Sequence, residues 1–333
     1  MEYGELADLV HEYNPTVISN RSTYKDQKNK NLNDIYDDYM KDIDDIWDQA
    51  DSADNDITWA SLRYSAGLLT KQADNNYEDA DMEKIQYDQQ EAKLVYQAQE
   101  MMVSLKQSAY NLENLQSTKE LLQKQYEAAQ AQLSVGMATQ TDVLTALKRV
   151  QDQDSAILTA QKSQENVHRN LCLMLGWSAD AQPEIKEVPQ PDLSRIDTLD
   201  PNADAQTAID NNYDVKYYTK KAGNLDSQDL IESNQATLAN AKDTAVRSLK
   251  TQYNTVLTTR DALNAAKAQL QVAEANLNIA QANLAVGSQT SLQYQSTLNP
   301  YTAAKNDVNT KQLQLLLALE AYDWNVKGLT TSN

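Results

Sequence analysis

The residues of this chain that could do chemistry are mainly aspartates, two histidines and one cysteine. Ten aspartates lie between Asp34 and Asp56, and Lys41 is the one basic residue among them. Carboxylate oxygens suit calcium, but an EF-hand loop also needs a glycine at its sixth position and a glutamate at its end. Neither is present here at that spacing. We therefore interpret this stretch as a solvated acidic face or loop.

The histidines and the cysteine do not form a recognisable metal or catalytic motif. His11 and His168 are far apart in the sequence, and there is no HExxH or Cys/His cluster around them. Cys172 is alone, which rules out an intramolecular disulfide, and its apolar surroundings in LCLML predict burial. Phosphate-binding GxxxxGK[ST], dinucleotide-binding GxGxxG and nucleophile-elbow GxSxG motifs are also absent. We predict no catalytic residue, cofactor or metal, and a protein that is not an enzyme.

The composition favours long helices. The chain has 333 residues but only 7 glycines and 6 prolines, and helix-forming residues dominate it. A net charge of −19 argues against a nucleic-acid partner, because phosphate binding needs clustered lysine and arginine. No apolar run reaches the roughly 18 residues of a membrane span, so we expect no direct span. The sequence also begins without a recognisable signal peptide.

The prolines divide the chain into two halves. None occurs between Pro15 and Pro183 or between Pro201 and Pro300, and four of the six lie within 183–201. Each proline removes a helical donor and restricts the residue before it, so this cluster reads as a linker. The predicted organisation is a first helical-hairpin repeat at 1–176, a Pro-rich linker at 177–203 and a second helical-hairpin repeat at 204–333.

Heptad spacing indicates coiled-coil packing in both halves. In the second half, large apolar residues recur every seven positions, at Leu249, Val256, Leu263, Leu270, Leu277 and Leu284, with Ala266, Ala273 and Ala280 between them. The first half has a looser version from Leu105 to Leu133, which Lys119 interrupts. These seams predict long antiparallel helices that pack as hairpins and invite further neighbours.

The dipeptide Val-Gly marks the bend of each predicted hairpin. Gly136 and Gly287 follow long stretches without glycine or proline, and each can adopt a left-handed conformation at a helix end. Three residues later, Thr139 and Thr290 can cap the returning helix. Gly176 is a further candidate helix C-cap. If the helix that enters the first tip runs unbroken from near Trp59, it has roughly 75 residues and a length of about 110 Å.

At this point the chain resembles the TolC-type outer membrane efflux protein family. The resemblance rests on VGMATQTDVLTA with a following helix that ends in LCLMLGW, on VGSQTSLQYQS followed by LLLALEAYDWNVKGL, and on a helix start at LADLVHEYNP. In that family three protomers assemble their hairpins into a hollow α-helical barrel. The hairpin tips dock onto an adaptor protein that links the barrel to an inner-membrane pump.

The resemblance implies the partners, the location and the tip residues. We expect a homotrimer that works with a periplasmic-adaptor or membrane-fusion-type protein and an inner-membrane ABC or proton-driven pump. The expected location is extracytoplasmic, in the cell envelope. The residues that would face the adaptor are Val135, Gly136, Met137, Val286, Gly287 and Ser288. Turn chemistry alone would also explain the glycines and threonines, and this alternative stays open.

Two departures from the family pattern concern a barrel and a gate. Family members carry a pair of strands in each half that completes a transmembrane β-barrel, whereas the corresponding segments here are polar, acidic and too short. We expect no transmembrane β-barrel, through either nature or engineering. The family's gate aspartates correspond to Gln293 and Ser296, and its locking arginine and tyrosine to Gln289 and Leu284. Only Asp142 keeps the pattern, so we expect a looser or differently controlled aperture.

Pro300 lies inside the helix that returns from the second tip. A proline at this position is expected to kink or break the helix. It would serve either as a bend that adapts the rod to the curvature of a cylinder or as a hinge that moves during opening.

The sequence thus predicts an all-α protein of two repeated long antiparallel helical hairpins. Its predicted function is that of a tunnel or conduit component of a tripartite-type efflux or secretion system, which docks through its hairpin tips to an adaptor. The alternative is an elongated coiled-coil scaffold or spacer that conducts nothing.

Overall fold

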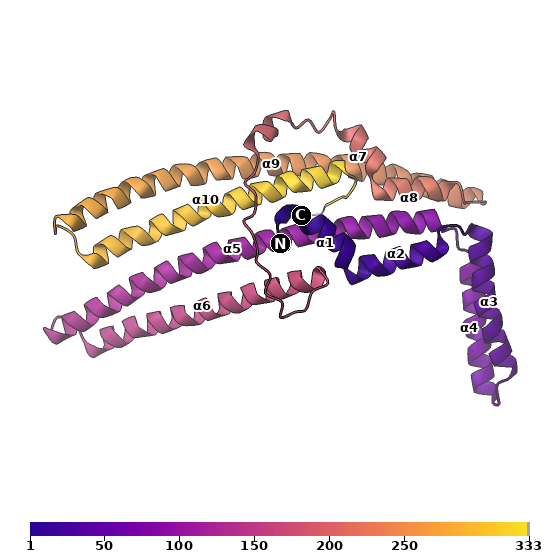
Figure 1. The fold of residues 1–333 in the computed structure, drawn as a ribbon, viewed down its shortest axis with the longest axis horizontal. Helices are drawn as coiled ribbons and strands as arrows, with labels where there is room; N and C mark the ends of the chain where they lie inside the picture. The colour runs from indigo at the N-terminus through magenta and orange to yellow at the C-terminus, as the bar shows by residue number, and fades with distance from the viewer. Residues whose placement is uncertain (332–333) are drawn as a thin grey trace. The chain divides into compact units, whose positions relative to one another are not determined.

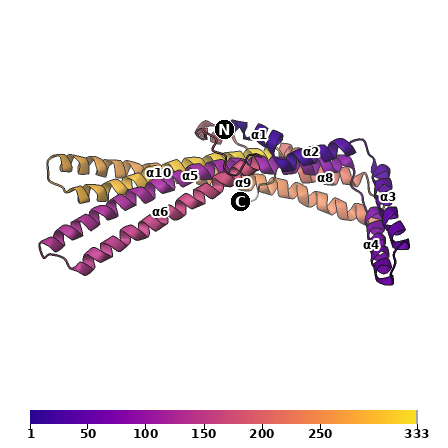
Figure 2. The ribbon, with the colours of Figure 1, turned by 60° about the horizontal axis from the view of Figure 1, so that its bottom comes forward.

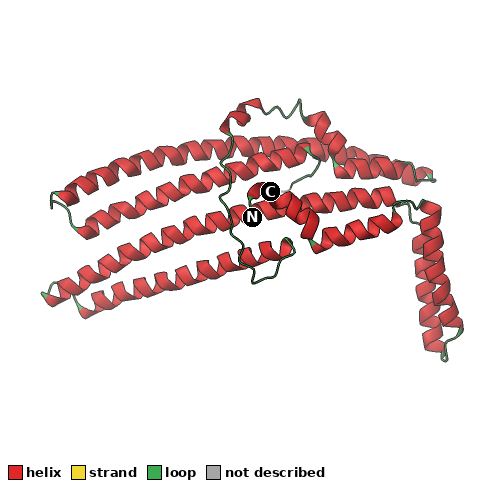
Figure 3. Cartoon of the chain, in the orientation of Figure 1, coloured by secondary structure: helices red, strands yellow, loops and turns green. Residues whose placement is uncertain are grey.

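The computed structural model describes residues 1–331, which form helices joined by turns and loops and contain no strand (Figure 3). The prediction of an all-α fold is therefore confirmed. Among these residues no helix is both long enough and apolar enough to cross a membrane. The elements are η1 (Tyr3–Glu5), α1 (Leu6–Tyr13), α2 (Pro15–Gln27), α3 (Leu32–Asp51), α4 (Asp56–Asp74), α5 (Ala80–Ser134), α6 (Gln140–Met174), η2 (Leu193–Thr198), α7 (Ala205–Asn211), α8 (Tyr213–Ala222), α9 (Gln228–Ala285) and α10 (Ser291–Val326).

The chain divides into two compact units, each of which takes segments from both halves of the sequence. Unit 1 comprises Met1–Asn14, Leu94–Pro201 and Leu249–Trp324. Unit 2 comprises Pro15–Lys93, Asn202–Ser248 and the segment that starts at Asn325. The units are thus grouped differently from the sequence halves, and the division into two repeats around a 177–203 linker stays a prediction about internal similarity.

Unit 1 contains the greater part of the two long hairpins, including both tips. Helices α5 and α6 form the first hairpin, and α9 and α10 form the second (Figure 1). Both views show them side by side in the order α6, α5, α10, α9 (Figures 1 and 2). Hydrogen bonds join α5 to α6 through the Gln153 amide and the Leu115 carbonyl (2.8 Å), and α5 to α10 through the Asn306 amide and the Asn114 side chain (2.8 Å).

The heptad seam of the second hairpin is present as predicted. Leu249, Val256 and Leu263 are buried. The leucines of the seam nearer the tip, Leu270, Leu277 and Leu284, are half-buried. The smaller Ala280 is buried. In the first hairpin, Lys119 interrupts the apolar seam but contributes an ion pair across it, 2.7 Å from Asp154 on α6.

Gly176 ends α6 where the chain passes close to α1. Its φ is +70°, and the amides of Gly176 and Trp177 donate to the carbonyls of Leu173 and Cys172 (3.1 and 2.9 Å). This is the Schellman pattern, which satisfies the last carbonyls of a helix. A Cβ at Gly176 would lie 2.1 Å from the carbonyl oxygen of Tyr13, so this position also needs the absence of a side chain. Cys172 is buried, as predicted.

The Pro-rich segment between α6 and α7 is fixed to unit 1 by ion pairs. Lys106 of α5 lies 2.6 Å from Glu187. Arg195, in the short helix η2, pairs with Asp323 of α10. The segment is therefore extended but held against the helices at two separate points.

Unit 2 contains a break that the sequence did not mark. Helix α4 ends at Asp74 and α5 begins at Ala80, so the expected unbroken helix from Trp59 to the first tip is wrong. The side chain of Asp79 caps the new helix, accepting a hydrogen bond from the Met82 amide (2.9 Å). Polar side chains stop and restart the helix here without glycine or proline.

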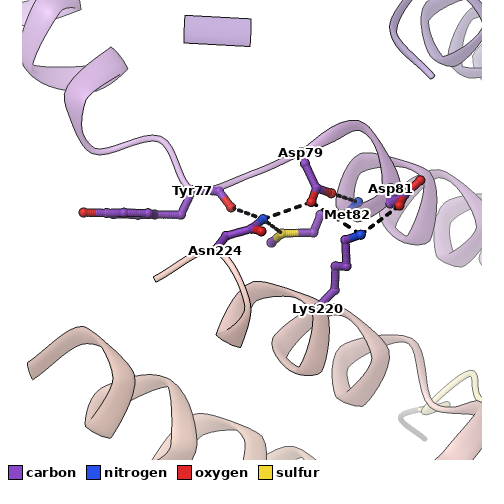
Figure 4. A network of polar contacts seen from close by, with 6 residues as sticks. All are labelled: Tyr77, Asp79, Asp81, Met82, Lys220 and Asn224. Carbon is purple, nitrogen blue, oxygen red and sulfur yellow. Dashed lines mark hydrogen bonds and ion pairs between the residues drawn. The ribbon is translucent and has the colours of Figure 1, made fainter. Parts of the chain in front are cut away.

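A polar network ties the start of α5 to the end of α8 (Figure 4). The Asn224 amide donates to the Tyr77 carbonyl and to an Asp79 carboxylate oxygen, both at 3.0 Å. The Lys220 ammonium lies 2.8 Å from Asp81 and 3.6 Å from Asp79. Because Asn224 donates a hydrogen bond to Asp79, the residue that caps α5, this network fixes the position of the helix break.

The acidic segment of the sequence forms α3 and the turn that follows it. Helices α3 and α4 pack as a hairpin around a small core of Ile43, Ala66 and Ala73. Of the eight aspartates on α3, each is exposed, so the acidic stretch is a solvated helix face.

Pro300 does not break α10, which runs continuously from Ser291 to Val326. Pro300 is exposed, so the backbone bond that it cannot donate lies on the solvent side of the helix. The expected break is wrong, and the hinge role stays a prediction.

Candidate functional site

The two hairpin tips have the same length and lie at the same end of unit 1 (Figures 1 and 2). The first loop joins Ser134 of α5 to Gln140 of α6, and the second joins Ala285 of α9 to Ser291 of α10. Each loop therefore has five residues, Val-Gly at its start and threonine at its end. The predicted tip residues therefore lie in two loops at the same end of unit 1.

Each tip begins with the same helix ending. Gly136 has a φ of +76° and Gly287 a φ of +71°. At the first tip the amides of Gly136 and Met137 donate to Leu133 and Gln132 (3.0 and 2.8 Å). At the second tip the amides of Gly287 and Ser288 donate in the same way, to the carbonyls of Leu284 and Asn283 (3.1 and 2.9 Å). Both are Schellman motifs, and a left-handed glycine makes them possible.

Each tip also ends with the same capping arrangement. At the first tip the Thr139 amide donates to Asp142 (2.8 Å), and the Asp142 amide donates to the Thr139 hydroxyl (3.2 Å). At the second tip Thr290 and Gln293 exchange the equivalent bonds at 2.8 and 3.2 Å. These are capping boxes. Hydrogen bonds from the Thr139 side chain and backbone hold the pKa of the Asp142 carboxyl below its ordinary value.

Asp142 and Gln293 were predicted as gate residues, and the structure gives both of them a local task. They lie on different hairpins, and each completes the first turn of its own helix. Helix capping is thus a sufficient reason for an acid or an amide at these two positions. Their role in a gate stays a prediction.

The remaining candidate gate and hinge residues line one groove. Gln289, Ser296 and Pro300 border a groove of about 700 Å³ between α9 and α10, close to the second tip. Val272 and Ile279 of α9 line it as well and are 63% and 61% exposed. None of the groove's lining residues carries a charge. This groove can hold an apolar or neutral polar surface, and it offers no acid or base for proton transfer.

The outermost tip side chains are unusually exposed for apolar residues. Val135 and Met137 are 68% and 79% exposed, and Val286 is 78% exposed. Ser288 takes the position of Met137 at the second tip and is also exposed. Exposed apolar side chains at the ends of rigid hairpins are typical of contact surfaces.

Sequence reasoning missed a polar seam between the two hairpins. The amide of Asn299 donates to the hydroxyls of Ser117 and Thr118 (3.3 and 3.1 Å). One heptad later, the amide of Asn306 donates to Asn114 (2.8 Å) and to the backbone. The available signal was the seven-residue spacing of two asparagines on a helix whose other heptad positions are apolar.

The described residues contain no group of three or more histidine, cysteine, aspartate or glutamate side chains placed to hold a metal ion. The sulfur of Cys172 lies 3.9 Å from Nδ1 of His168, one helical turn away on α6. Burial raises the pKa of the Cys172 thiol, which keeps it protonated and unreactive.

Known structures with the same fold include membrane proteins. A membrane protein from Pseudomonas aeruginosa matches with a TM-score of 0.62 and 13% identity, covering 97% of this chain and 93% of that one. The outer membrane protein VceC from Vibrio cholerae matches with a TM-score of 0.56 and 13% identity, covering 99% and 97%. CusC, which forms a transmembrane channel, matches with a TM-score of 0.57 and 12% identity, covering 99% and 96%. Neither a protein-family model nor a curated protein matches the sequence.

The chain therefore has the helical-hairpin fold of TolC-type outer-membrane channels. The resemblance inferred from the tip sequences is confirmed at the level of the fold. The channel formed by CusC is consistent with the prediction of a protein that is not an enzyme, which stays a prediction.

Proposed function

We propose that this protein is a conduit component of an efflux or secretion system of the cell envelope, in which three copies assemble their hairpins into an α-helical barrel. The observation that carries the proposal is the pair of hairpins in unit 1, whose tip loops of equal length lie at one end (Figures 1 and 2). The channel-forming proteins of the same fold support it.

The edges of the helical layer in unit 1 suit assembly. Helices α6 and α9 form the two edges of the layer (Figure 1). Each carries large apolar side chains that are more than half exposed. On α6, Leu144 and Leu158 are 55% and 52% exposed. On α9, Val272 and Ile279 are more than half exposed. Packing α6 of one copy against α9 of the next would bury both stripes and, repeated, close a ring.

The tips would then form one end of the barrel and contact an adaptor protein. In this proposal Val135, Met137 and Val286 provide apolar contacts, while the capping boxes keep the loops rigid. Transport is passive, and a partner ABC or proton-driven pump supplies the energy. A rigid tip loses little conformational entropy on binding, which favours affinity.

Mass in solution and low-resolution imaging test the assembly together. We expect a mass of three chains and a hollow cross-section. The variants Leu158→Asp on α6 and Ile279→Asp on α9 are each expected to abolish the mass of three chains, because they place a carboxylate in the contact. Ser163→Asp, exposed on a different side of α6, is the matched control and should leave the mass unchanged.

A straight one-chain or two-chain bundle in the images would refute the conduit and favour the scaffold or spacer.

Adaptor docking is tested separately with Met137→Asp and Val286→Asp, which are expected to weaken binding of a recombinant adaptor hairpin at least tenfold without changing the mass. Unchanged binding in both variants would refute docking through the tips.

A further inference from the structure

Helix α4 of the α3–α4 hairpin in unit 2 has its apolar residues arranged in the reverse of what a self-sufficient hairpin needs, whereas α3 buries the large Ile43. The α4 residues that face α3 are the small Ala66 and Ala73, which are 0% and 4% exposed. The large residues Ile57, Tyr64 and Leu68 are 84%, 70% and 51% exposed. A hairpin that is stable alone would bury its largest apolar side chains between its helices.

These three large residues form a continuous stripe. Their spacing of i, i+7 and i+11 places them within about 40° on a helix of 3.6 residues per turn. Ala66 lies nine residues after Ile57, which is roughly half a turn away, so the stripe is on the face opposite α3. With Ser61 between them, Ile57, Tyr64 and Leu68 follow the 4-3-4 spacing of a coiled-coil seam.

The charges of the hairpin are separated between its two helices. Helix α3 carries eight aspartates and one lysine. From Ile57 to Gln72, α4 has no acidic residue, and its charges are Arg63 and Lys71. Arg63 is already held between the rings of Trp47 and Trp59, 4.8 and 5.0 Å from their centroids. The apolar stripe thus lies on the weakly charged helix, with the acidic face behind it.

We propose that the α4 stripe is a contact between copies of this chain, in which α4 of one copy packs against α4 of another. This arrangement buries Ile57, Tyr64 and Leu68 while the aspartates of both α3 helices point outward to solvent. No carboxylate lies on the stripe itself, and Asp56 lies at the end of α4, so like-charge repulsion is weak in the middle of the contact.

The charge pattern disfavours other occupants. A basic partner helix would meet Arg63 and Lys71 on α4 rather than acids. An anionic membrane surface would repel the aspartates of α3, which flank the hairpin. A second α4 offers the same apolar stripe, which can pack against its own copy, and the positive charge that the two copies bring together is small. This contact is separate from the α6 and α9 edges of the proposed conduit, and its test does not require a closed ring.

Cysteine cross-linking on the full chain tests the contact directly. Cys172 is the chain's single cysteine and is buried, so Cys172→Ala gives a background without other thiols. In that background Ser61→Cys places a thiol on the stripe, and Asp45→Cys places one on the exposed face of α3 as the control. Under mild oxidation we expect Ser61→Cys to form at least tenfold more covalent dimer than Asp45→Cys.

Adding Tyr64→Lys and Leu68→Lys to the Ser61→Cys chain should reduce that dimer at least tenfold, with unchanged helical circular dichroism. Equal cross-linking from Ser61→Cys and Asp45→Cys would overturn the proposal. So would dimer that persists in the lysine variant. Loss of the Ser61→Cys dimer on adding phosphatidylcholine vesicles, with a blue shift of tryptophan emission, would assign the stripe to a lipid surface instead. Because Leu158→Asp and Ile279→Asp leave the stripe intact, the Ser61→Cys dimer should survive them even if the conduit does not form.

Discussion

The two tips of unit 1 share a backbone but differ in their side chains. At both tips a left-handed glycine ends the first helix and a threonine capping box begins the next one. The two glycines, Gly136 and Gly287, are 151 residues apart. At the first tip Met137, Asp142 and Leu144 are exposed. The second tip has Ser288, Gln293 and Gln295 at the corresponding positions.

This difference separates what a hairpin bend requires from what a surface is free to vary. The glycine and the threonine satisfy the backbone groups at the helix ends, so both tips need them. The positions that vary do not change the bend. Both tips expose a valine. Beside it, tip 1 adds an apolar and an acidic side chain, whereas tip 2 adds neutral polar ones, so the two would make different contacts with a partner.

The largest expected effect is at Gly176, the third Schellman ending, which provides a comparison for the two tips. Gly176→Ala should destabilise the protein by about 2–5 kcal/mol, because it adds left-handed strain and a steric clash with the Tyr13 carbonyl. Urea unfolding followed by circular dichroism measures the change. Gly67→Ala, at an uncrowded helical position, is the control and should be neutral or stabilising. A loss below about 1 kcal/mol at Gly176 would show that the backbone moves there freely.

Replacing either tip glycine is expected to cost less stability than replacing Gly176, and the two tip replacements are expected to cost the same. A Cβ at Gly136 or Gly287 would meet no atom within 4 Å, so only the positive φ opposes it. Gly136→Ala and Gly287→Ala should each destabilise their hairpin by about 1 kcal/mol in the same unfolding measurement. A clear difference between the two variants would contradict the equivalence of the tip backbones.

The next largest loss of stability is expected from replacing the capping threonines. Thr139→Ala and Thr290→Ala each remove a hydroxyl acceptor and should cost about 1 kcal/mol. Hydrogen exchange of the first-turn amides of α6 and α10 measures the loss locally. Thr145→Ala is the control, since its hydroxyl bonds only to the Thr141 carbonyl within the helix. Faster exchange at one tip alone would mean that the other box is dispensable.

The smallest effect is acid sensitivity at one tip only. Because the folded pKa of Asp142 is lowered, its contribution is present above the unfolded pKa of about 3.9 and is lost as pH falls through the folded pKa. The NMR shift of the Thr139 amide should titrate over that range, and that of Thr290 should not, since Gln293 is neutral. Asp142→Asn should abolish the titration. A matching shift at Thr290 would show that the acid response is not local.

Much of the fold could be read from the sequence because its signals are local and periodic. The heptad leucines around Leu263, the glycine at each tip and the threonine caps each act through neighbours a few residues away. The break between Asn75 and Ala80 could not be read, because capping residues such as Asp79 resemble the polar surface of an uninterrupted helix.

The candidate site was less predictable, since family spacing identified positions without showing their local bonds. Asp142 and Gln293 were expected near an aperture, yet both complete capping boxes. The reversed faces of α4 also escaped notice, because periodicity alone does not tell which of two apolar faces meets the neighbouring helix. Ala66 and Ile57 look equally suitable for a core until α3 is placed.

The asparagine seam between α5 and α10 has a consequence for how firmly the hairpins adhere. Leucine interfaces exclude water, whereas amides and hydroxyls accept it as a substitute partner. The Oδ1 atom of Asn306 is buried without a hydrogen bond, so an entering water molecule would satisfy it. Hydration of this seam can therefore weaken the contact between the two hairpins of unit 1 without unfolding either hairpin.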